Sequence, residues 1–320
     1  MGQVAQKNSM TTLDDLYVEA ERLDVTPGWV SRDQPLFWRE PRSSYRPHHW
    51  SYQDVKNALA AAGDLIDVAH AERRNLILRN PFPGNNFATT KTLVCAYQMI
   101  LPGEVAPSHR HAAHALRVII DGKGSYSIVN GTKMAMESGD VVLTPGTYWH
   151  GHGHEGDEPA YWLDGLDLPS VHLTEAMFIE EYPQKYEPIS SVAASSPFRF
   201  TRDAIARKLE TATPDSEGRH DGVIGLETPD MPMMGLTVEK LRAGFKGRAQ
   251  RSTANRIFVV MEGTGQTVVG TTTFKWSRGD TIVVPTWQNY SHQADIDSIL
   301  FGLSDEPLMR AFRYFRSEVA

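Results

Sequence analysis

The chain has little cysteine: Cys95 is the only one among 320 residues. An intrachain disulfide and a cage of thiolate metal ligands are therefore both excluded, and a transition-metal site must use nitrogen and oxygen ligands. Long apolar runs are also missing, since no stretch reaches about 18 consecutive apolar residues, and residues 1–24 lack a basic segment followed by an apolar one. We therefore expect a cytoplasmic protein without a membrane span.

Basic clusters are scarce as well. The 32 Lys and Arg residues are outnumbered by 39 Asp and Glu residues, which gives a net charge of -7, and no long basic run is present. Nucleic acid is therefore a poor candidate partner. A hydrophobic content of 41% and a charged content of 22% are typical of globular proteins, and the length favours two cores over one.

The spacing of apolar residues changes along the chain. Apolar residues recur at helical spacing between Leu13 and Leu23 and again between Tyr52 and Leu65, which predicts an N-terminal helical arm over residues 1–80. From Thr92 onward, short β-rich runs alternate with Gly and Pro, as in antiparallel barrels and sandwiches. We expect one domain over residues 81–190, a linker with a helical segment over residues 191–222, and a second domain over residues 223–320.

A long internal repeat links the two predicted domains. The run Gly139-Asp-Val-Val-Leu-Thr-Pro145 matches Gly279-Asp-Thr-Ile-Val-Val-Pro285, and the Val118-Ile-Ile-Asp-Gly122 segment matches the one ending at Gly263. The spacing is too long for a solenoid repeat. Matches in the same order at a nearly constant offset indicate two copies of one fold.

Three histidines in the first copy have the spacing of a metal site. His109 and His111 alternate along a predicted strand, so both imidazoles project from the same face. His150 follows the Gly139 to Pro145 segment, where a neighbouring strand brings it to the same interior. Imidazole suits several transition metals, so the ligand type alone does not select one.

This arrangement resembles the two motifs of the cupin superfamily, whose members are small jelly-roll barrels that hold a metal inside. With the repeat, the chain resembles a bicupin: a mainly β protein of two jelly-roll barrels preceded by the helical arm. The acidic ligand of many cupins falls at Ala115 or Leu116, neither of which binds metal. In the second copy, the three histidine positions hold Gln250, Ser252 and Tyr290. We expect a metal in the first copy only.

Further segments are similar to the gentisate 1,2-dioxygenase family, which includes salicylate, 5-nitrosalicylate and 1-hydroxy-2-naphthoate dioxygenases. These segments are Pro41-Arg-Ser, Glu72-Arg-Arg74, Arg79-Asn-Pro81, His109-Arg-His, Ala115-Leu-Arg117, His150-Gly-His152-Gly and Trp162-Leu-Asp164-Gly-Leu-Asp167, with Val284-Pro-Thr-Trp287 and Phe301-Gly-Leu-Ser-Asp305 in the second copy. The resemblance implies Fe(II), O2 and cleavage of the ring bond between the carboxyl-bearing and hydroxyl-bearing carbons. It also implies a homotetramer.

The resemblance extends to residues around the metal. Arg117 lies six residues after His111, on the same face by strand parity, and matches a family arginine that pairs with the substrate carboxylate or with developing charge. His152 is a candidate for acid–base or oxygen-orienting work. Gln98 matches a pocket glutamine of the family. Asp164 is a candidate to orient a ligand or pocket histidine by a hydrogen bond, and Arg73 is a candidate to reach the pocket from the arm.

The identity of the ring substituent stays open. Ala113 lies where the family has a polar residue, and Val94 replaces a bulkier side chain, so the pocket differs from the usual family pattern near the ring. Gentisate is the first choice among 2-hydroxybenzoate-type acids, with 5-nitrosalicylate, salicylate and 1-hydroxy-2-naphthoate as alternatives. An aromatic-acid-binding cupin without turnover and a metal-dependent isomerase or hydrolase are the other classes considered.

Overall fold

The computed structural model describes residues 10–29, 36–71, 73–228 and 230–319. The chain divides into two compact units, residues 1–41 and residues 42–320. In the first unit, helix α1 (Leu13–Arg22) begins at Thr12, whose hydroxyl accepts a hydrogen bond from the Asp15 backbone N–H in a capping box. The helix predicted from the spacing between Leu13 and Leu23 is thereby confirmed.

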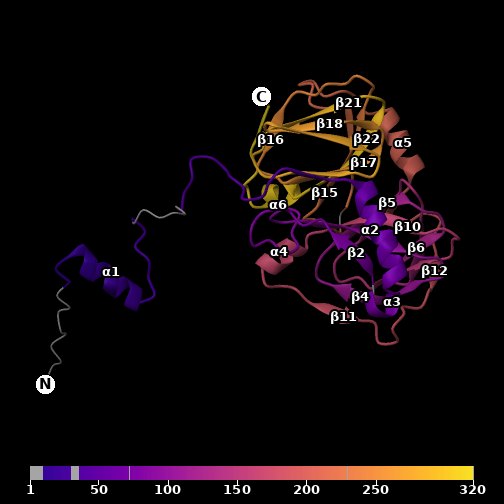
Figure 1. Ribbon diagram of the computed structural model, residues 1–320, viewed down its shortest axis with the longest axis horizontal. Coiled ribbons are helices and arrows are strands. Elements are labelled where there is room, and N and C mark those ends of the chain that lie inside the picture. Colours follow the sequence, from indigo (N-terminus) through magenta and orange to yellow (C-terminus); the bar gives the residue numbers. More distant parts are fainter. Residues whose placement is uncertain (1–9, 30–35, 72, 229, 320) are drawn as a thin grey trace. The chain divides into compact units, whose positions relative to one another are not determined.

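The described strands of the second unit form four mainly antiparallel sheets, two in each barrel (Figure 1). The first barrel has one sheet in the order β13 (Arg199–Phe200), β8 (Val141–Thr144), β5 (Ala115–Asp121), β10 (Ala160–Leu166), β3 (Val94–Ile100) and β2 (Arg74–Ile77). Its other sheet has the order β11 (Ile179–Glu181), β4 (Val105–His111), β9 (His150–His154), β6 (Ser125–Val129), β7 (Thr132–Met136) and β12 (Ser191–Val192).

The second barrel repeats this plan. One sheet has the order β1 (His48–Trp50), β20 (Thr281–Val284), β17 (Arg256–Glu262), β22 (Ser298–Ser304), β15 (Gly235–Leu241) and β14 (Gly222–Leu226). The other has the order β19 (Thr272–Ser277), β18 (Thr264–Val269), β21 (Tyr290–Ala294), β16 (Gln250–Ser252) and β23 (Ser317–Val319). The remaining helices are α2 (Tyr52–Leu65), α3 (Val68–Ala71), α4 (Leu168–Leu173), α5 (Arg202–Glu210) and α6 (Glu306–Ala311). The predicted bicupin fold is confirmed.

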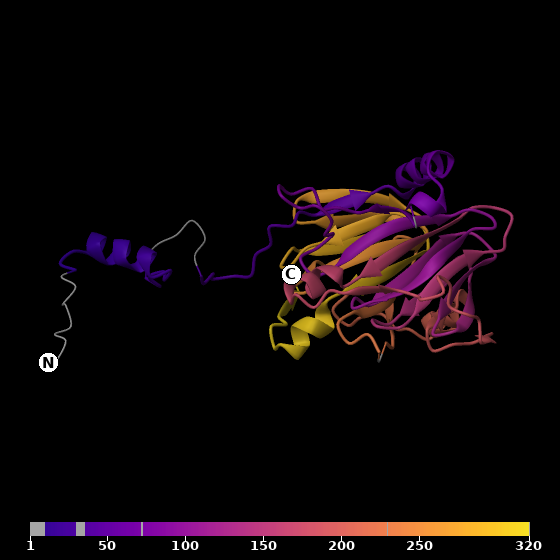
Figure 2. The ribbon, with the colours of Figure 1, turned by 90° about the horizontal axis from the view of Figure 1, so that it is seen from below.

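The two barrels pack against each other through one sheet of each, as Figure 2 shows. Strand alternation explains this packing, because every second side chain of β5 and β17 faces the partner barrel and the others face the interior of their own barrel. The shared core contains Leu116 and Val118 of the first barrel and Ile257 and Val259 of the second. Each barrel also has its own interior cluster.

The sheet of each barrel is completed by a short strand that precedes the other barrel in sequence, and the helix after that strand packs on the other barrel: α2 contacts β2 and β3, and α5 contacts β14 and β15. Strand β1 leads into α2 and pairs with β20 of the second barrel, whereas β13 leads into α5 and pairs with β8 of the first. The helices predicted between Tyr52 and Leu65 and near residues 200–210 are thus confirmed. Residues 42–80 were expected in the arm, but Tyr52 and Leu59 are buried in the core that joins the barrels.

Candidate metal centre and pocket

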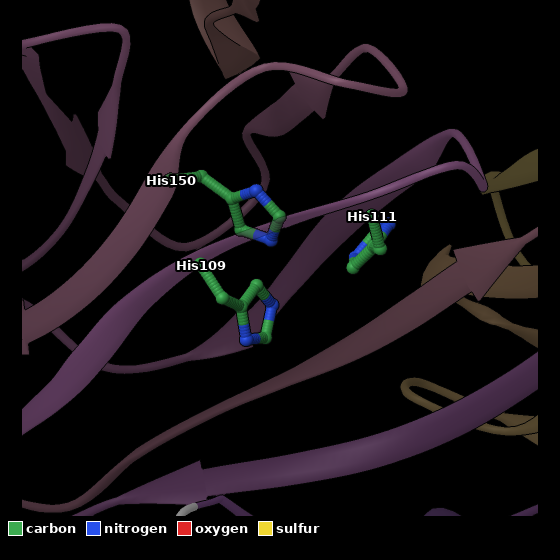
Figure 3. A group of neighbouring side chains, drawn as sticks. All are labelled: His109, His111 and His150. Atoms are coloured by element: carbon green, nitrogen blue, oxygen red, sulfur yellow. The ribbon is translucent and has the colours of Figure 1, made fainter. Parts of the chain in front are cut away.

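The three histidines of the first copy meet inside the first barrel. His109 and His150 are directly opposite each other on the antiparallel strands β4 and β9, and His111 follows on β4. One ring nitrogen from each lies within 4.8 Å of the others. The ring centroids are 4.6 to 5.2 Å apart. In Figure 3 the rings surround a common space, toward which nitrogens of all three point.

Backbone carbonyls fix the orientation of two of these rings. His111 Nδ1 lies 2.8 Å from the Ala113 carbonyl oxygen, and His150 Nδ1 lies 3.0 Å from the Tyr148 carbonyl oxygen. These contacts place the proton on Nδ1, because a carbonyl oxygen only accepts. Nε2 of each ring is left with its lone pair, which is the form that binds a metal ion.

Burial keeps the imidazoles neutral. It lowers the pKa of His111 to about 4 and that of His109 to about 2, and it lowers the pKa of His150 well below its ordinary value. Neighbouring positive charges, including the Arg117 guanidinium, act in the same direction. Three neutral nitrogen donors in a buried cluster fit a divalent transition-metal ion.

The glycines between the histidines of β9 have a packing reason. A Cβ atom at Gly153 would overlap the ring and hydroxyl of Tyr126, and one at Gly151 would meet the Ser108 hydroxyl. Only glycine permits these close approaches. The alternation of histidine and glycine therefore places the imidazoles of His150 and His152 on the inner face and the bare backbone on the outer face.

His152 is buried beside the cluster without a polar partner. The residue is only 1% exposed, and its ring centroid lies 6.0 Å from that of His150. Neither of its ring nitrogens has a hydrogen-bond partner among the described residues. Burial, together with the charge of Arg117, lowers the pKa of His152 well below its ordinary value. A neutral imidazole with unused donor and acceptor capacity suits a ligand in the adjacent space.

Arg117 is held by a carboxylate and a hydroxyl. Its Nη1 donates to Thr144 Oγ1 at 2.7 Å, and its Nε lies 3.2 Å from Asp164 Oδ1. Asp164 also accepts from Trp162 Nε1 at 3.1 Å. Burial raises the pKa of Asp164 to about 6, and Arg117 opposes this shift. The partners found for Asp164 are thus an arginine and a tryptophan, whereas the sequence suggested a histidine.

The other predicted pocket residues lie at different depths. Gln98 is 4% exposed and lies opposite Trp162, on the inner face of β3. Ala113 is fully buried in the turn after His111. Arg73 donates from Nη2 to the Pro107 carbonyl oxygen at 2.8 Å and lines a cavity that also includes His109.

That cavity, with a volume of about 840 Å³, leads from the surface to His109. The segment from Ile179 to Lys185 forms its far wall. Strand β11, at the start of this segment, pairs with β4, so Glu181 lies opposite His109. This segment could not be found from the sequence, because a three-residue strand carries no clear periodicity. The same applies to Thr144, which was noted only as part of a repeat.

A fold of two fused cupin barrels with a buried three-histidine cluster in one of them defines a metal-dependent bicupin. Residues 96–166 match the cupin domain family. The chain is 33% identical to gentisate 1,2-dioxygenase 1 of Aquipseudomonas alcaligenes, over 94% of this chain and 95% of that protein. It is 32% identical to 5-aminosalicylate 1,2-dioxygenase of Comamonas sp., over 98% of this chain and 92% of the relative.

A solved structure shows the same likeness. Salicylate 1,2-dioxygenase from Pseudoaminobacter salicylatoxidans, with gentisate bound, superposes with a TM-score of 0.87 at 28% identity, over 100% of this chain and 97% of that one. The chain belongs to the gentisate 1,2-dioxygenase family. It is a ring-cleaving dioxygenase, as the sequence motifs predicted.

Proposed function

We propose that this enzyme is an Fe(II)-dependent dioxygenase that cleaves gentisate between its carboxyl-bearing and hydroxyl-bearing ring carbons. The observation that carries the proposal is the convergence of three neutral imidazoles in a barrel whose interior also holds the buried cation Arg117. Two of the relatives described above act on gentisate or on an aminosalicylate by name, and the salicylate enzyme binds gentisate.

His109, His111 and His150 would hold the iron, each through one ring nitrogen. Bound there, Fe(II) supplies redox chemistry with O2 and open positions for a substrate that chelates through two oxygens. Because all three ligands are neutral, the charge of the ion is not cancelled by the protein, which favours an anionic 2-hydroxybenzoate.

The surrounding side chains bind and orient the substrate. Arg117, held by Asp164 and Thr144, provides a fixed guanidinium for the carboxylate or for charge that develops during cleavage. His152 has both ring nitrogens available to donate to or accept from substrate oxygens. We assign Asp164 to positioning Arg117, Gln98 and Ala113 to the walls around the ring, and Arg73 to the entrance.

The proposal also names the ring substituent of the substrate, the second hydroxyl group of gentisate. We assign Ala113, a small apolar residue in the turn after the ligand His111, to the part of the pocket that receives the ring substituent. Salicylate, 5-nitrosalicylate and 1-hydroxy-2-naphthoate are the alternatives. We also propose a homotetramer located in the cytoplasm. The described helices include none that is long and apolar enough to cross a membrane.

The test is oxygen uptake after anaerobic reconstitution with Fe(II). Gentisate, salicylate, 5-nitrosalicylate and 1-hydroxy-2-naphthoate are compared at equal concentration, and the products are identified by mass. We expect the highest kcat/KM with gentisate and a mass gain of two oxygen atoms. Faster uptake with another acid would replace gentisate as the substrate, and no uptake with any of them would overturn the proposal.

A further inference from the structure

A second cavity lies between the two barrels, away from the histidine centre. Its volume is about 340 Å³, and it shares no lining residue with the cavity that reaches His109. Strand β5 of the first barrel, strand β17 of the second and helix α5 form its walls. Small-molecule sites often occur at such domain interfaces and have volumes of this order.

The internal repeat provides a filled counterpart of this cavity. Tyr52 and Arg202 each begin a helix, directly after the N-cap residues Ser51 and Thr201. The Tyr52 backbone N–H donates to Asp280 Oδ1 at 2.8 Å, and the Arg202 backbone N–H donates to Asp140 Oδ1 at 2.9 Å. The two helices therefore dock on the two barrels in the same way.

The residues that follow fill one site and leave the other open. On the α2 side, the Tyr52 hydroxyl donates to Asp121 at 2.8 Å and Lys56 Nζ lies 2.6 Å from the same carboxylate. On the α5 side, Arg202 pairs with Glu262 at 2.6 Å, but the residue one turn later is Ala206. The short alanine side chain lacks the stem and charge that Lys56 contributes on the other side.

The lining of the open site combines apolar walls with two arginine side chains, each of which is paired with one carboxylate. Ile205, Val259 and Ile299 provide aliphatic surface. The charged lining side chains are Arg202, Arg278 and Glu262, two cations and one anion. Arg278 reaches across the interface, with Nη1 2.8 Å from Asp121 Oδ1 and Nη2 3.0 Å from Ser138 Oγ. Such a site suits a ligand with a flat apolar body and one anionic group.

We propose that this interbarrel cavity, defined by Arg202, Ala206 and Arg278, binds an aromatic monocarboxylate. The ring lies on the aliphatic wall, and the carboxylate meets the guanidinium groups at the rim. The site needs neither a metal nor a hydroxyl group next to the carboxylate, so it does not depend on the substrate proposed above.

The test uses 4-fluorobenzoate, which has no ortho-hydroxyl group for chelation, with full-length holoenzyme under argon. Binding is followed by fluorine NMR. Ala206→Leu fills the cavity without changing the charge, and we expect it to weaken binding at least tenfold. Ala206→Lys restores the residue type of the filled site and should weaken binding to a similar degree, although it adds a positive charge.

Two further variants keep the result interpretable. Lys208→Leu places the same side chain on α5 away from the cavity and serves as the matched control, with unchanged affinity expected. Arg202→Gln removes an exposed guanidinium, leaves the helix intact and should also weaken binding. Probe bound beside the histidine centre is insensitive to all four changes. Equal affinity in wild type, Ala206→Leu and Arg202→Gln, or stronger binding by Ala206→Lys, would overturn the proposal.

Discussion

Six of the twelve histidines of the chain lie in two short segments, residues 109–114 and 150–154, and their contacts indicate different roles. His114 resembles the metal candidates in sequence but differs in contacts. Its backbone N–H donates to Asp167 Oδ1 at 2.8 Å, and its Nδ1 accepts from the Gly146 backbone N–H at 2.9 Å. In the second barrel, Asn255 makes the same pair of contacts with Asp305 and Thr286. His114 thus has a structural role: its hydrogen bonds connect Asp167 to the turn at Gly146.

The difference in contacts between His114 and the three metal candidates predicts the outcome of histidine substitutions. His109→Ala, His111→Ala and His150→Ala each remove one of three nitrogen donors, so bound iron should fall at least tenfold when measured by mass spectrometry after dialysis. His114→Asn is the matched control, because it installs the residue that the second barrel uses. It should retain iron and activity. Iron loss in His114→Asn equal to that in His150→Ala would contradict the assignment.

A second residue-scale prediction concerns Glu239, buried in the second barrel. Burial raises its pKa from 4.5 to about 7, an effect that nearby Arg256 partly opposes. Between these values the folded protein keeps a proton that the unfolded chain releases, so the free energy of unfolding falls as pH rises through this window. Glu239→Gln cannot ionise. It should exceed the wild type in stability by about 3 kcal/mol at pH 8 and by under about 1 kcal/mol at pH 5.

Chemical denaturation at the two pH values measures this difference. The Lys275→Gln variant, which changes an exposed charge on β19 of the same barrel, provides a control for general charge effects. An equal stability gain from Glu239→Gln at both pH values would show that the carboxylate is ionised throughout, or protonated throughout.

Residue types and spacing predicted the histidine cluster because imidazoles are scarce and alternate along a strand. The same reasoning could not find Thr144 or Lys185. A threonine that fixes an arginine looks like any strand threonine, and Lys185 reaches the cavity only because residues 179–181 pair with β4. Such contacts depend on pairing between distant segments, which one sequence does not specify.

At the scale of elements, the exchange of strands β1 and β13 between the barrels is the main feature hidden from the sequence. The helices were predictable because each is long enough, at 14 residues for α2 and 9 for α5, to show apolar residues at helical spacing. The strands β1 and β13 have three and two residues, too few to show alternation. Hydrophobic periodicity therefore could not show which barrel each of these strands joins, although the repeated Gly-Asp turns mark the places where the helix starts dock.

Two equivalent aspartates hold these elements. Asp140 accepts from the Arg202 backbone N–H and pairs with Arg199 at 2.7 Å, and Asp280 accepts from the Tyr52 backbone N–H and lies 3.0 Å from His49 Nε2. Asp140→Asn and Asp280→Asn each weaken charge-assisted hydrogen bonds to a helix start. Each should lower the free energy of unfolding by about 2 kcal/mol.

Urea denaturation measures these losses. Asp203→Asn is the control, since it alters an acidic residue in the first turn of α5 with no side-chain contact to the barrel among the described hydrogen bonds. If Asp140→Asn matches that control, the aspartate does not anchor α5.

For residues 42–320 as a whole, the exchanged elements and the shared core tie the barrels into one folding unit. The core between them includes Leu303 of β22, which is 1% exposed, whereas Leu300 of the same strand is buried inside the second barrel. A repeat in sequence predicts two barrels but not whether they unfold separately. The reciprocal strand pairing favours a single transition, because neither barrel keeps a complete sheet when the other unfolds.

Two alanine variants test this cooperativity. Leu303→Ala opens a cavity at the interface and Leu300→Ala opens one inside the second barrel; each should cost about 2–5 kcal/mol. If the barrels unfold together, each variant shifts one calorimetric transition to lower temperature, and the ratio of calorimetric to van't Hoff enthalpy stays near one. Independent barrels would give a different pattern. Leu300→Ala would then split the trace, moving the transition of the second barrel while that of the histidine-containing barrel stays at its original temperature.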